Sequence, residues 1–300
     1  MGRGAAETEA ELIIDAKASL GEGPCWDAEN GLLYWVDILG HRVHIYDPAT
    51  NRDRSIDVGQ MVSAVVKRAS GGFVIAAKNG LYFLDPQTEE LILITDPESG
   101  IPGNRFNDGK CDPAGRFWAG TMSMSGGKPA GSLYRLDSDG TLIKMMEGVA
   151  CSNGLAWSPG RGTMYYIDSP TRQVTAMDYD VSTGRIGNRR AVITLPPGEG
   201  VPDGMTTDSE GMLWVAQWGG WKVSRWNPYT GERLETVSVP AAQVTSCAFG
   251  GPELNELYIT SARTGLSESD LAQQPSAGGV FRWKSKVKGM PAFAYGGQTV

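Results

Sequence analysis

The pattern Gly31-Leu-Leu-Tyr-Trp-Val-Asp37 joins a turn residue to a short run of aromatic and β-branched residues and then to a polar residue. This order is typical of a tight turn followed by a buried β-strand. Five further copies begin, 41 to 49 residues apart, at Gly72, Gly115, Gly162, Gly211 and Asn255. A repeat of this length predicts a fold built from six similar units.

A second strand follows the pattern within the units. It reads Val43-His-Ile-Tyr-Asp-Pro48 in the first unit and Leu81-Tyr-Phe-Leu-Asp-Pro86 in the second. Asp-Pro pairs end strands and begin turns. Each unit has room for about four short antiparallel strands, which is the size of a propeller blade. We therefore expect an all-β, six-bladed β-propeller with four antiparallel strands per blade.

The two ends of such a ring must be joined, because an open ring leaves unpaired strand edges. The apolar run Glu11-Leu-Ile-Ile-Asp-Ala16 is expected to close the ring as the outer strand of the sixth blade. A short helix is expected at residues 267–274. We expect a single propeller domain over residues 11–300 and a disordered segment over residues 1–10.

Composition and charge exclude several classes of function. The 300 residues include 27 Lys and Arg against 34 Asp and Glu, giving a formal net charge of −7, so nucleic acid is not expected as a partner. There is no apolar run of about 18 residues and no signal-peptide core, which predicts a cytoplasmic protein without membrane contact. The four cysteines stand far apart and are expected to be free thiols. Nothing in the sequence indicates an obligate protein partner.

Polar residues stand eight or nine positions before the copies of the pattern. Because the blades are related by rotation, residues at one position of the repeat converge on the axis of the ring. They are Glu22, Asn107, Asn153, Asp203 and Ser246, with Val62 or Ser63 in the second unit. Asn-Gly and Asp-Gly pairs also favour hairpin turns, so each pair taken alone is open to that interpretation. The shared position, and a Glu without turn preference, favour an oxygen-rich cup at the axis.

The oxygen donors of this cup suit a hard divalent cation. Carboxylate and amide oxygens are the ligands preferred by Ca²⁺, Mg²⁺ and Mn²⁺. The two histidines, His41 and His44, lie on one predicted hairpin and are expected to face solvent. A Ser-His-Asp triad or a Cys-His pair is therefore not expected.

At these residues the sequence resembles the family of senescence marker protein (regucalcin) and bacterial gluconolactonases. The resemblance covers the chain from about residue 20 to about residue 297 and implies a six-bladed propeller with one divalent metal ion in its channel. The motifs that carry it are Arg105-Phe-Asn-Asp-Gly-Lys110, Asp112-Pro-Ala-Gly-Arg-Phe117, Ala119-Gly-Thr-Met122, Ser152-Asn-Gly-Leu-Ala-Trp-Ser158, Tyr165-Tyr-Ile-Asp-Ser169, Pro202-Asp-Gly-Met205 and Thr245-Ser-Cys-Ala-Phe-Gly-Gly251.

Residue by residue, the resemblance implies roles for five positions. Glu22, Asn153 and Asp203 would be the protein ligands of the metal ion. Arg105 and Asn107 would contact the hydroxyls and ring of a sugar lactone. Ca²⁺ is the expected ion, with Zn²⁺, Mg²⁺ or Mn²⁺ as alternatives.

Three further residues bear on the choice of substrate. Similar animal proteins have a substrate-contacting Glu four residues after the Thr of the Ala-Gly-Thr-Met motif, where this chain has Ser125. A hydroxyl cannot reach or pair with charge as a carboxylate does, which leaves the preferred sugar open. Trp218 and Trp221 are expected either to stack on a sugar at the rim or to wedge between blades.

The predicted function is hydrolysis of a sugar (aldono-)lactone, with the metal polarising the carbonyl and Asp203 activating water. Two alternatives stay open. One is a metal-dependent phosphotriesterase or aryl esterase, by analogy of fold, and the other is a non-enzymatic calcium-binding regulator. An Arg and several amides suit a hydroxylated lactone, whereas an organophosphate needs a more apolar cup. No EF-hand loop is present to support the regulator.

Overall fold

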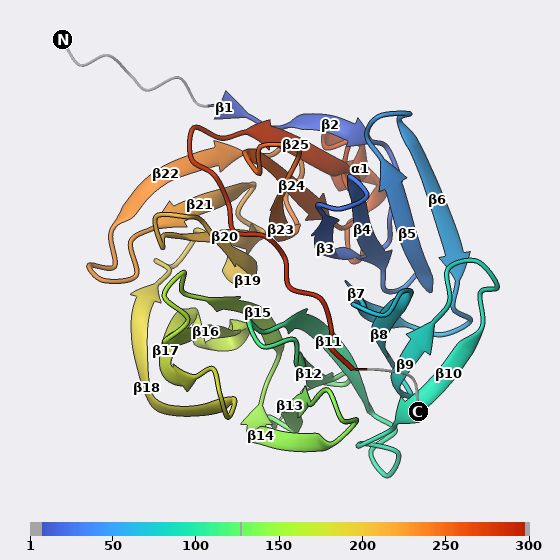
Figure 1. Cartoon of the computed structure of the whole chain (residues 1–300). Helices are drawn as coiled ribbons and strands as arrows, with labels where there is room; N and C mark the ends of the chain where they lie inside the picture. Colours follow the sequence, from blue (N-terminus) through green and yellow to red (C-terminus); the bar gives the residue numbers. More distant parts are fainter. Residues whose placement is uncertain (1–7, 127, 298–300) are drawn as a thin grey trace.

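The computed structural model describes residues 8–126 and 128–297, which form six β-sheets arranged in a ring (Figure 1). Each sheet is one blade, and its four main strands pair antiparallel. The first three blades consist of β3 (Gly21–Asp27), β4 (Leu32–Asp37), β5 (Arg42–Asp47) and β6 (Arg52–Asp57); β7 (Val62–Lys67), β8 (Phe73–Ala77), β9 (Gly80–Leu84) and β10 (Leu91–Thr95); and β11 (Asn104–Cys111), β12 (Phe117–Ser123), β13 (Gly131–Leu136) and β14 (Leu142–Val149).

The other three blades complete the ring. They consist of β15 (Ser152–Trp157), β16 (Thr163–Asp168), β17 (Gln173–Asp180) and β18 (Arg185–Thr194); β19 (Val201–Thr207), β20 (Leu213–Trp218), β21 (Lys222–Trp226) and β22 (Arg233–Ser238); and β23 (Val244–Gly250), β24 (Glu256–Ser261), β25 (Val280–Lys284) and β2 (Glu11–Ile14). The predicted six-bladed propeller is confirmed.

The first strand of each blade lies next to the axis of the ring. The innermost strands β3, β7, β11, β15, β19 and β23 each pack against the innermost strands of the two neighbouring blades. The repeated pattern forms the second strand, since β4 starts directly after Gly31. The polar positions that precede the pattern therefore lie on the innermost strands.

The N-terminal segment closes the ring as predicted, and it also adds a strand to the fifth blade. Strand β2 pairs antiparallel with β25, with Glu11 opposite Arg282. Strand β1 (Thr8–Glu9) adds a parallel strand to β22 of the fifth blade, and Ala10 donates its N–H to the carbonyl oxygen of Ser238 at 2.8 Å. Residues 1–7 of the segment expected to be disordered lie outside the described residues, whereas residues 8–10 are ordered.

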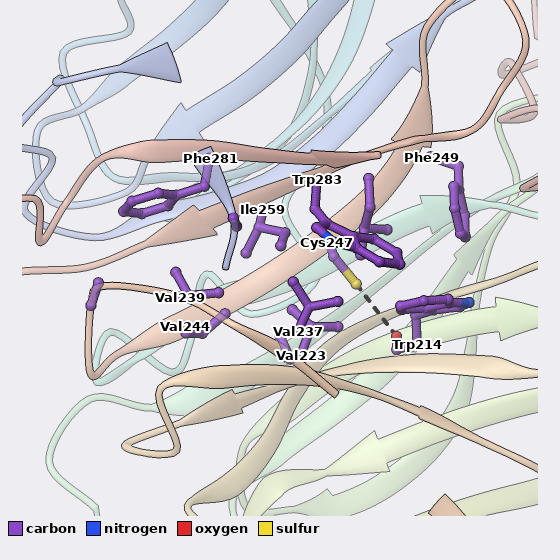
Figure 2. Packing of buried hydrophobic residues seen from close by; sticks show 14 of the residues in the cluster. Trp214, Val223, Val237, Val239, Val244, Cys247, Phe249, Ile259, Phe281 and Trp283 are labelled. Atoms are coloured by element: carbon purple, nitrogen blue, oxygen red, sulfur yellow. Dashed lines mark hydrogen bonds between the residues drawn. The ribbon is translucent and has the colours of Figure 1, made fainter. Parts of the chain in front are cut away.

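Hydrophobic side chains fill the spaces between neighbouring blades. Figure 2 shows the cluster between the fifth and sixth blades, where Trp214 of β20 meets Phe249 of β23 and Trp283 of β25. The Trp214 and Phe249 rings meet edge to face, with centroids 5.7 Å apart. Cys247 donates its thiol hydrogen to the carbonyl oxygen of Trp214 at 3.4 Å. The aromatic residue of the repeated pattern is thus a core residue that joins blades.

Buried aspartates tie innermost strands to other strands of their own blade and, at Asp112, to the next blade. Asp112, directly after β11, is 0 % exposed. It accepts hydrogen bonds from Trp118 Nε1 at 2.9 Å, Tyr179 Oη at 2.7 Å and Arg116 Nη1 at 3.2 Å. Asp208 of the fifth blade likewise accepts from an indole and a guanidinium group. Each carboxylate is paired with a cation, which offsets the cost of burying its charge.

The C-terminal segment crosses one end of the channel (Figure 1). The carbonyl oxygen of Lys288 accepts a hydrogen bond from Ser209 N–H in the fifth blade. On the other side of the ring, Tyr295 donates its N–H to the carbonyl oxygen of Lys67 in the second blade at 2.8 Å. The Tyr295 side chain is buried and donates its hydroxyl to the carbonyl oxygen of Asp137 at 2.8 Å. A cavity of about 70 Å³ lies beneath this segment.

The expectation for the histidines is wrong at His44. Its ring is buried and stacks on Trp35, with centroids 3.8 Å apart, and its Nδ1 lies 2.6 Å from Asp53 Oδ2. Strand alternation predicted an outward side chain, but both faces of a middle strand such as β5 are covered by neighbouring blades. His41 is half-buried in the turn before β5.

The remaining expectations about local structure are confirmed. All four cysteines are free thiols. Helix α1 (Glu268–Gln273) begins with a capping box, in which Ser267 accepts from the N–H of Asp270 while the Asp270 carboxylate accepts from the N–H of Ser267. None of the helices in residues 8–126 and 128–297 is long and apolar enough to cross a membrane.

Candidate active site

Every innermost strand is interrupted by a β-bulge at the level of the predicted cup. The register shifts fall between Glu22 and Cys25, Val62 and Ala64, Phe106 and Asp108, Asn153 and Leu155, Pro202 and Met205, and Val244 and Ser246. A bulge disrupts the ladder and changes the direction of a side chain. The Asn-Gly and Asp-Gly pairs therefore lie within bulged strands, and the interpretation of these pairs as hairpin turns is wrong.

The cup is a cavity of about 430 Å³ at the end of the channel where the innermost strands begin. These strands run from the cavity toward the C-terminal segment, so the two ends of the channel differ. The cavity brings together the side chains of all five residues that the sequence assigned to metal and substrate: Glu22, Arg105, Asn107, Asn153 and Asp203. Each of these residues is buried.

A chain of hydrogen bonds fixes the orientation of both amides. Arg105 Nη1 donates to Asn107 Oδ1 at 2.8 Å, and Asn107 Nδ2 donates to Asn153 Oδ1 at 3.1 Å. Asn153 Nδ2 donates to Ser169 Oγ at 2.8 Å, and Ser169 Oγ donates to the carbonyl oxygen of Pro202 at 2.7 Å. The Asn153 amide oxygen keeps a second lone pair, which is available to a cation.

Among the described lining residues of the cavity, Arg105 supplies the one positive charge, and it offsets only part of the cost of burying the two carboxylates. Burial, together with the charges of Asp203 and Asp108, raises the pKa of Glu22 well above its usual value. Burial and the charge of Asp108 likewise raise the pKa of Asp203. Asp203 Oδ1 is buried and has no hydrogen-bond partner among the described residues. A bound cation would satisfy this oxygen and offset the repulsion between the carboxylates.

The donor set fits a hard divalent cation. Two carboxylates and one amide oxygen are typical ligands of Ca²⁺ and related ions. Within the described part of the chain, no three His, Cys, Asp or Glu side chains form a group that could hold a metal ion. The set at the axis is not such a group, because its third member, Asn153, is an amide.

Because Asp108 is buried, we expect the stability of the cation-free protein, measured in EDTA, to depend on pH. Burial raises its pKa to about 6 from a usual value of 3.8. Between these values the folded protein binds more protons than the unfolded chain, so stability falls as the pH rises through this interval. Asp108→Asn should therefore raise the free energy of unfolding at neutral pH by about 1–3 kcal/mol.

Urea denaturation of the variant and the wild type at about pH 4 and about pH 7.5 tests this prediction. The gain should be small at the lower pH, where the wild-type carboxyl is already protonated. An equal gain at both values would mean that the charge of Asp108 does not cause it.

Glycines behind the cup allow innermost strands to approach closely. A Cβ atom on Gly204 would lie 2.0 Å from Ser246 Oγ, and one on Gly154 would lie 2.8 Å from the carbonyl oxygen of Asp203. Ser246 is therefore packed against the neighbouring strand and lines the smaller cavity, not the cup. Ser63 Oγ donates to the carbonyl oxygen of Phe106. The prediction that Ser246 and Val62 or Ser63 line the cup is wrong.

The structure separates the three residues expected to influence substrate choice. Trp218, at the end of β20, lines the cavity. Trp221 does not, since it is 44 % exposed in the turn that follows. Ser125 is exposed, and its Oγ lies 3.1 Å from Ser123 Oγ rather than in the cavity wall.

The apolar wall of the cavity was not predicted from the sequence; it lies above the polar floor formed by Glu22, Asn107, Asn153 and Asp203. Leu20 and Val201 stand two residues before Glu22 and Asp203, so they lie on the same face of their strands, one step nearer the mouth. The alternation of side chains along a strand would have allowed Leu20 and Val201 to be predicted from the sequence. The other apolar side chains of the wall come from second strands and connections: Leu39, Met122, Pro170 and Trp218.

The fold and the site together define a six-bladed β-propeller with a buried, oxygen-lined cavity at one end of its channel. Residues 20–263 match the family described as the SMP-30/Gluconolactonase/LRE-like region. The chain belongs to this family, which confirms the resemblance inferred from the motifs.

Relatives match almost the whole chain. The putative sugar lactone lactonase YvrE of Bacillus subtilis is 43% identical over 289 residues, covering 96% of this chain and 99% of that protein. Regucalcin of Xenopus laevis is 41% identical over 294 residues, covering 96% and 98%. The crystal structure of a calcium-binding protein, regucalcin, from Agrobacterium tumefaciens has a TM-score of 0.92 at 31% identity, covering 96% and 97%.

Proposed function

We propose that this protein is a lactonase that hydrolyses a sugar lactone to the aldonic acid and uses one divalent cation, with Ca²⁺ as the first candidate. The observation that carries the proposal is the buried Asp203 Oδ1, which has no hydrogen-bond partner among the described residues. It shares a cavity with a guanidinium group and two amides. The name of the relative YvrE, a putative sugar lactone lactonase, supports the same class of substrate.

The cation is assigned to three residues. Glu22 and Asp203 would hold it through carboxylate oxygens, and Asn153 through its amide oxygen. When bound, a divalent cation supplies Lewis-acid polarisation of the lactone carbonyl. The two carboxylates, whose pKa values are raised by burial and by neighbouring carboxylates, would then be stabilised in their charged forms.

Asp203 is proposed to orient the attacking water and take its proton. The water oxygen adds to the carbonyl carbon, the ring C–O bond breaks, and the ring oxygen leaves as a hydroxyl that receives a proton. The products are a hydroxy acid and, at neutral pH, a released proton. General-base assistance of this kind contributes about 10²–10⁴ in rate.

Arg105 and Asn107 are proposed to hold the sugar. Arg105 is buried, and its Nη1 donates to Asn107 Oδ1 and to the carbonyl oxygen of Phe106. These bonds fix the guanidinium group in place before substrate binds, so little conformational entropy is lost on binding. The substrate hydroxyls near the ester would then meet preorganised donors.

The test is proton release from aldonolactones at neutral pH, first after EDTA treatment and then with Ca²⁺, Mg²⁺, Mn²⁺ or Zn²⁺ added singly. Cation-dependent hydrolysis of a lactone is the expected result. The apolar wall favours a second candidate, an esterase acting on aryl esters or phosphotriesters. Hydrolysis of phenyl acetate or paraoxon, without hydrolysis of any lactone, would establish that candidate instead.

Glu22→Gln should weaken cation binding. The substitution keeps the shape of the side chain but replaces a charged oxygen by an amide, so electrostatic attraction to the cation falls. Isothermal titration calorimetry with Ca²⁺ should show a Kd at least about tenfold higher, equivalent to a loss of about 1.4 kcal/mol. Glu29→Gln, an exposed residue beyond β3, is the matched control. An unchanged Kd in Glu22→Gln would remove this residue from the ligand set.

A further inference from the structure

The cavity has two levels of different chemistry. The lower level holds the polar side chains of Glu22, Asn107, Asn153 and Asp203. The upper level, nearer the mouth, is formed by the residues two positions earlier on the same strands and by neighbouring connections. Its apolar members are Leu20, Leu39, Met122, Pro170, Val201 and Trp218.

The upper level has one charged side chain among the described residues, Arg105 of the third blade. It stands two residues before Asn107, as Leu20 stands before Glu22 and Val201 before Asp203. Recognition of hydroxyl groups is therefore concentrated at the third blade. On the other sides a substrate meets mainly hydrocarbon, together with the Cys151 thiol and the Thr264 hydroxyl.

Two hydroxyl groups among the described residues line the cavity, and one of them is already engaged in hydrogen bonds. Ser169 Oγ already accepts from Asn153 Nδ2 and donates to the carbonyl oxygen of Pro202. The other belongs to Thr264, which is half-buried on the side of the sixth blade and leaves the side of Val201 in the fifth blade apolar. A substrate hydroxyl that faces Leu20 or Val201 would lose its hydrogen bonds to water and gain none in return, which is unfavourable.

The proposed function fixes which end of the substrate lies at each level. The ester carbonyl must lie at the lower level, beside Asp203. The ring carbons next to the carbonyl then lie within reach of Arg105 and Asn107. The carbon chain on the far side of the ring oxygen points toward the mouth and the apolar upper level.

We propose that the preferred substrate is a deoxy sugar lactone, with hydroxyls on the carbons near the carbonyl and a methyl group at the far end of the chain. This inference rests on the proposed function and specifies its substrate class. A terminal methyl group packs against the apolar upper level, whereas a terminal hydroxymethyl group places a hydroxyl there, where most of the wall offers it no partner.

Two pairs of lactones isolate this difference. L-fucono-γ-lactone and L-galactono-γ-lactone differ by one terminal hydroxyl, and L-rhamnono-γ-lactone and L-mannono-γ-lactone form a second such pair. We expect kcat/KM to be roughly 10- to 100-fold higher for the deoxy member of at least one pair. The assay is proton release with the cation that supports turnover.

A variant tests whether the wall causes the preference. Val201→Thr replaces a methyl by a hydroxyl of similar size and supplies the missing partner. It should lower the deoxy-to-hydroxy ratio of kcat/KM by roughly 2- to 10-fold, the effect of one net hydrogen bond. The control is Val181→Thr in the turn after β17, where Val181 is 36 % exposed and far from the cavity in the fold.

A second pair of variants keeps the test valid if Val201→Thr disturbs folding. Leu39→Ser makes the rim polar, and it should also lower the ratio. Leu12→Ser on the outer strand β2 is its matched control, because Leu39 and Leu12 are both 37 % exposed. Both controls should keep the wild-type ratio.

The outcomes separate failure of this inference from failure of the proposed function. Hydrolysis of the lactones with equal or higher kcat/KM for the hydroxylated member of both pairs would overturn the inference and leave the lactonase intact. A wild-type ratio in both Val201→Thr and Leu39→Ser would also overturn it. No hydrolysis of any lactone with any cation would overturn both.

Discussion

Asp203→Asn should lower kcat for lactone hydrolysis by roughly 10²–10⁴ while the fold is retained. The amide keeps the size of the side chain and one oxygen that can face the cation, but it cannot take a proton from water. Asp203 is buried, and its carboxyl pKa is raised by burial and by the charge of Asp108. Removing this charge should also raise the melting temperature in EDTA near neutral pH, where the wild-type carboxylate is costly to ionise.

Three measurements check this prediction: kcat from proton release, Kd for Ca²⁺ from calorimetry, and Tm in EDTA. Asp47→Asn is the control, because Asp47 lies in an exposed turn and accepts hydrogen bonds from Ala49 N–H and the Thr50 hydroxyl. Activity near the wild-type level in Asp203→Asn would show that another group activates the water. A lower Tm in EDTA would contradict the cost assigned to the buried charge.

Asp112→Ala should have the largest effect on stability, a loss of about 3–5 kcal/mol. The carboxylate is 0 % exposed and accepts hydrogen bonds from Trp118 Nε1, Tyr179 Oη and Arg116 Nη1. It also accepts from the backbone N–H groups of Ala114 and Arg116. Its removal leaves the buried donors of two blades without an acceptor.

Thermal denaturation should show a fall in Tm on the order of 10 °C. Asp85→Ala is the control, because Asp85 also accepts turn N–H groups, from Gln87 and Thr88, but in an exposed turn. A Tm for Asp112→Ala close to that of the control would mean that the network between the third and fourth blades adds little to stability.

The blade repeat could be predicted because each blade is built from local contacts. A strand followed by an Asp-Pro turn has the same form in every unit, and this regularity is visible in the sequence. The short strand β1 could not be predicted, since Thr8 and Glu9 pair with β22 through backbone groups, which leave no pattern of side chains. His44 was misplaced because alternation separates the two faces of a strand but does not say what covers each face.

The polar floor of the cavity could be predicted because its residues share one position in the repeat. Blades related by rotation bring such residues together at the axis. Ser63 and Ser246 share this position in the repeat but do not line the cup, because their hydroxyls are packed against neighbouring strands. The apolar wall could not be predicted, because Leu39, Met122 and Pro170 come from different elements of different blades. In sequence, an apolar residue at a cavity mouth looks the same as one in the core.

The C-terminal segment has a consequence for how molecules move through the site. It crosses the far end of the channel, and the small cavity beneath it shares no lining residue with the large one. Substrate must therefore enter, and product leave, through the same opening. In the proposed reaction a neutral molecule arrives through this opening and an anion departs through it. Each product must therefore leave through this opening before the next substrate can enter.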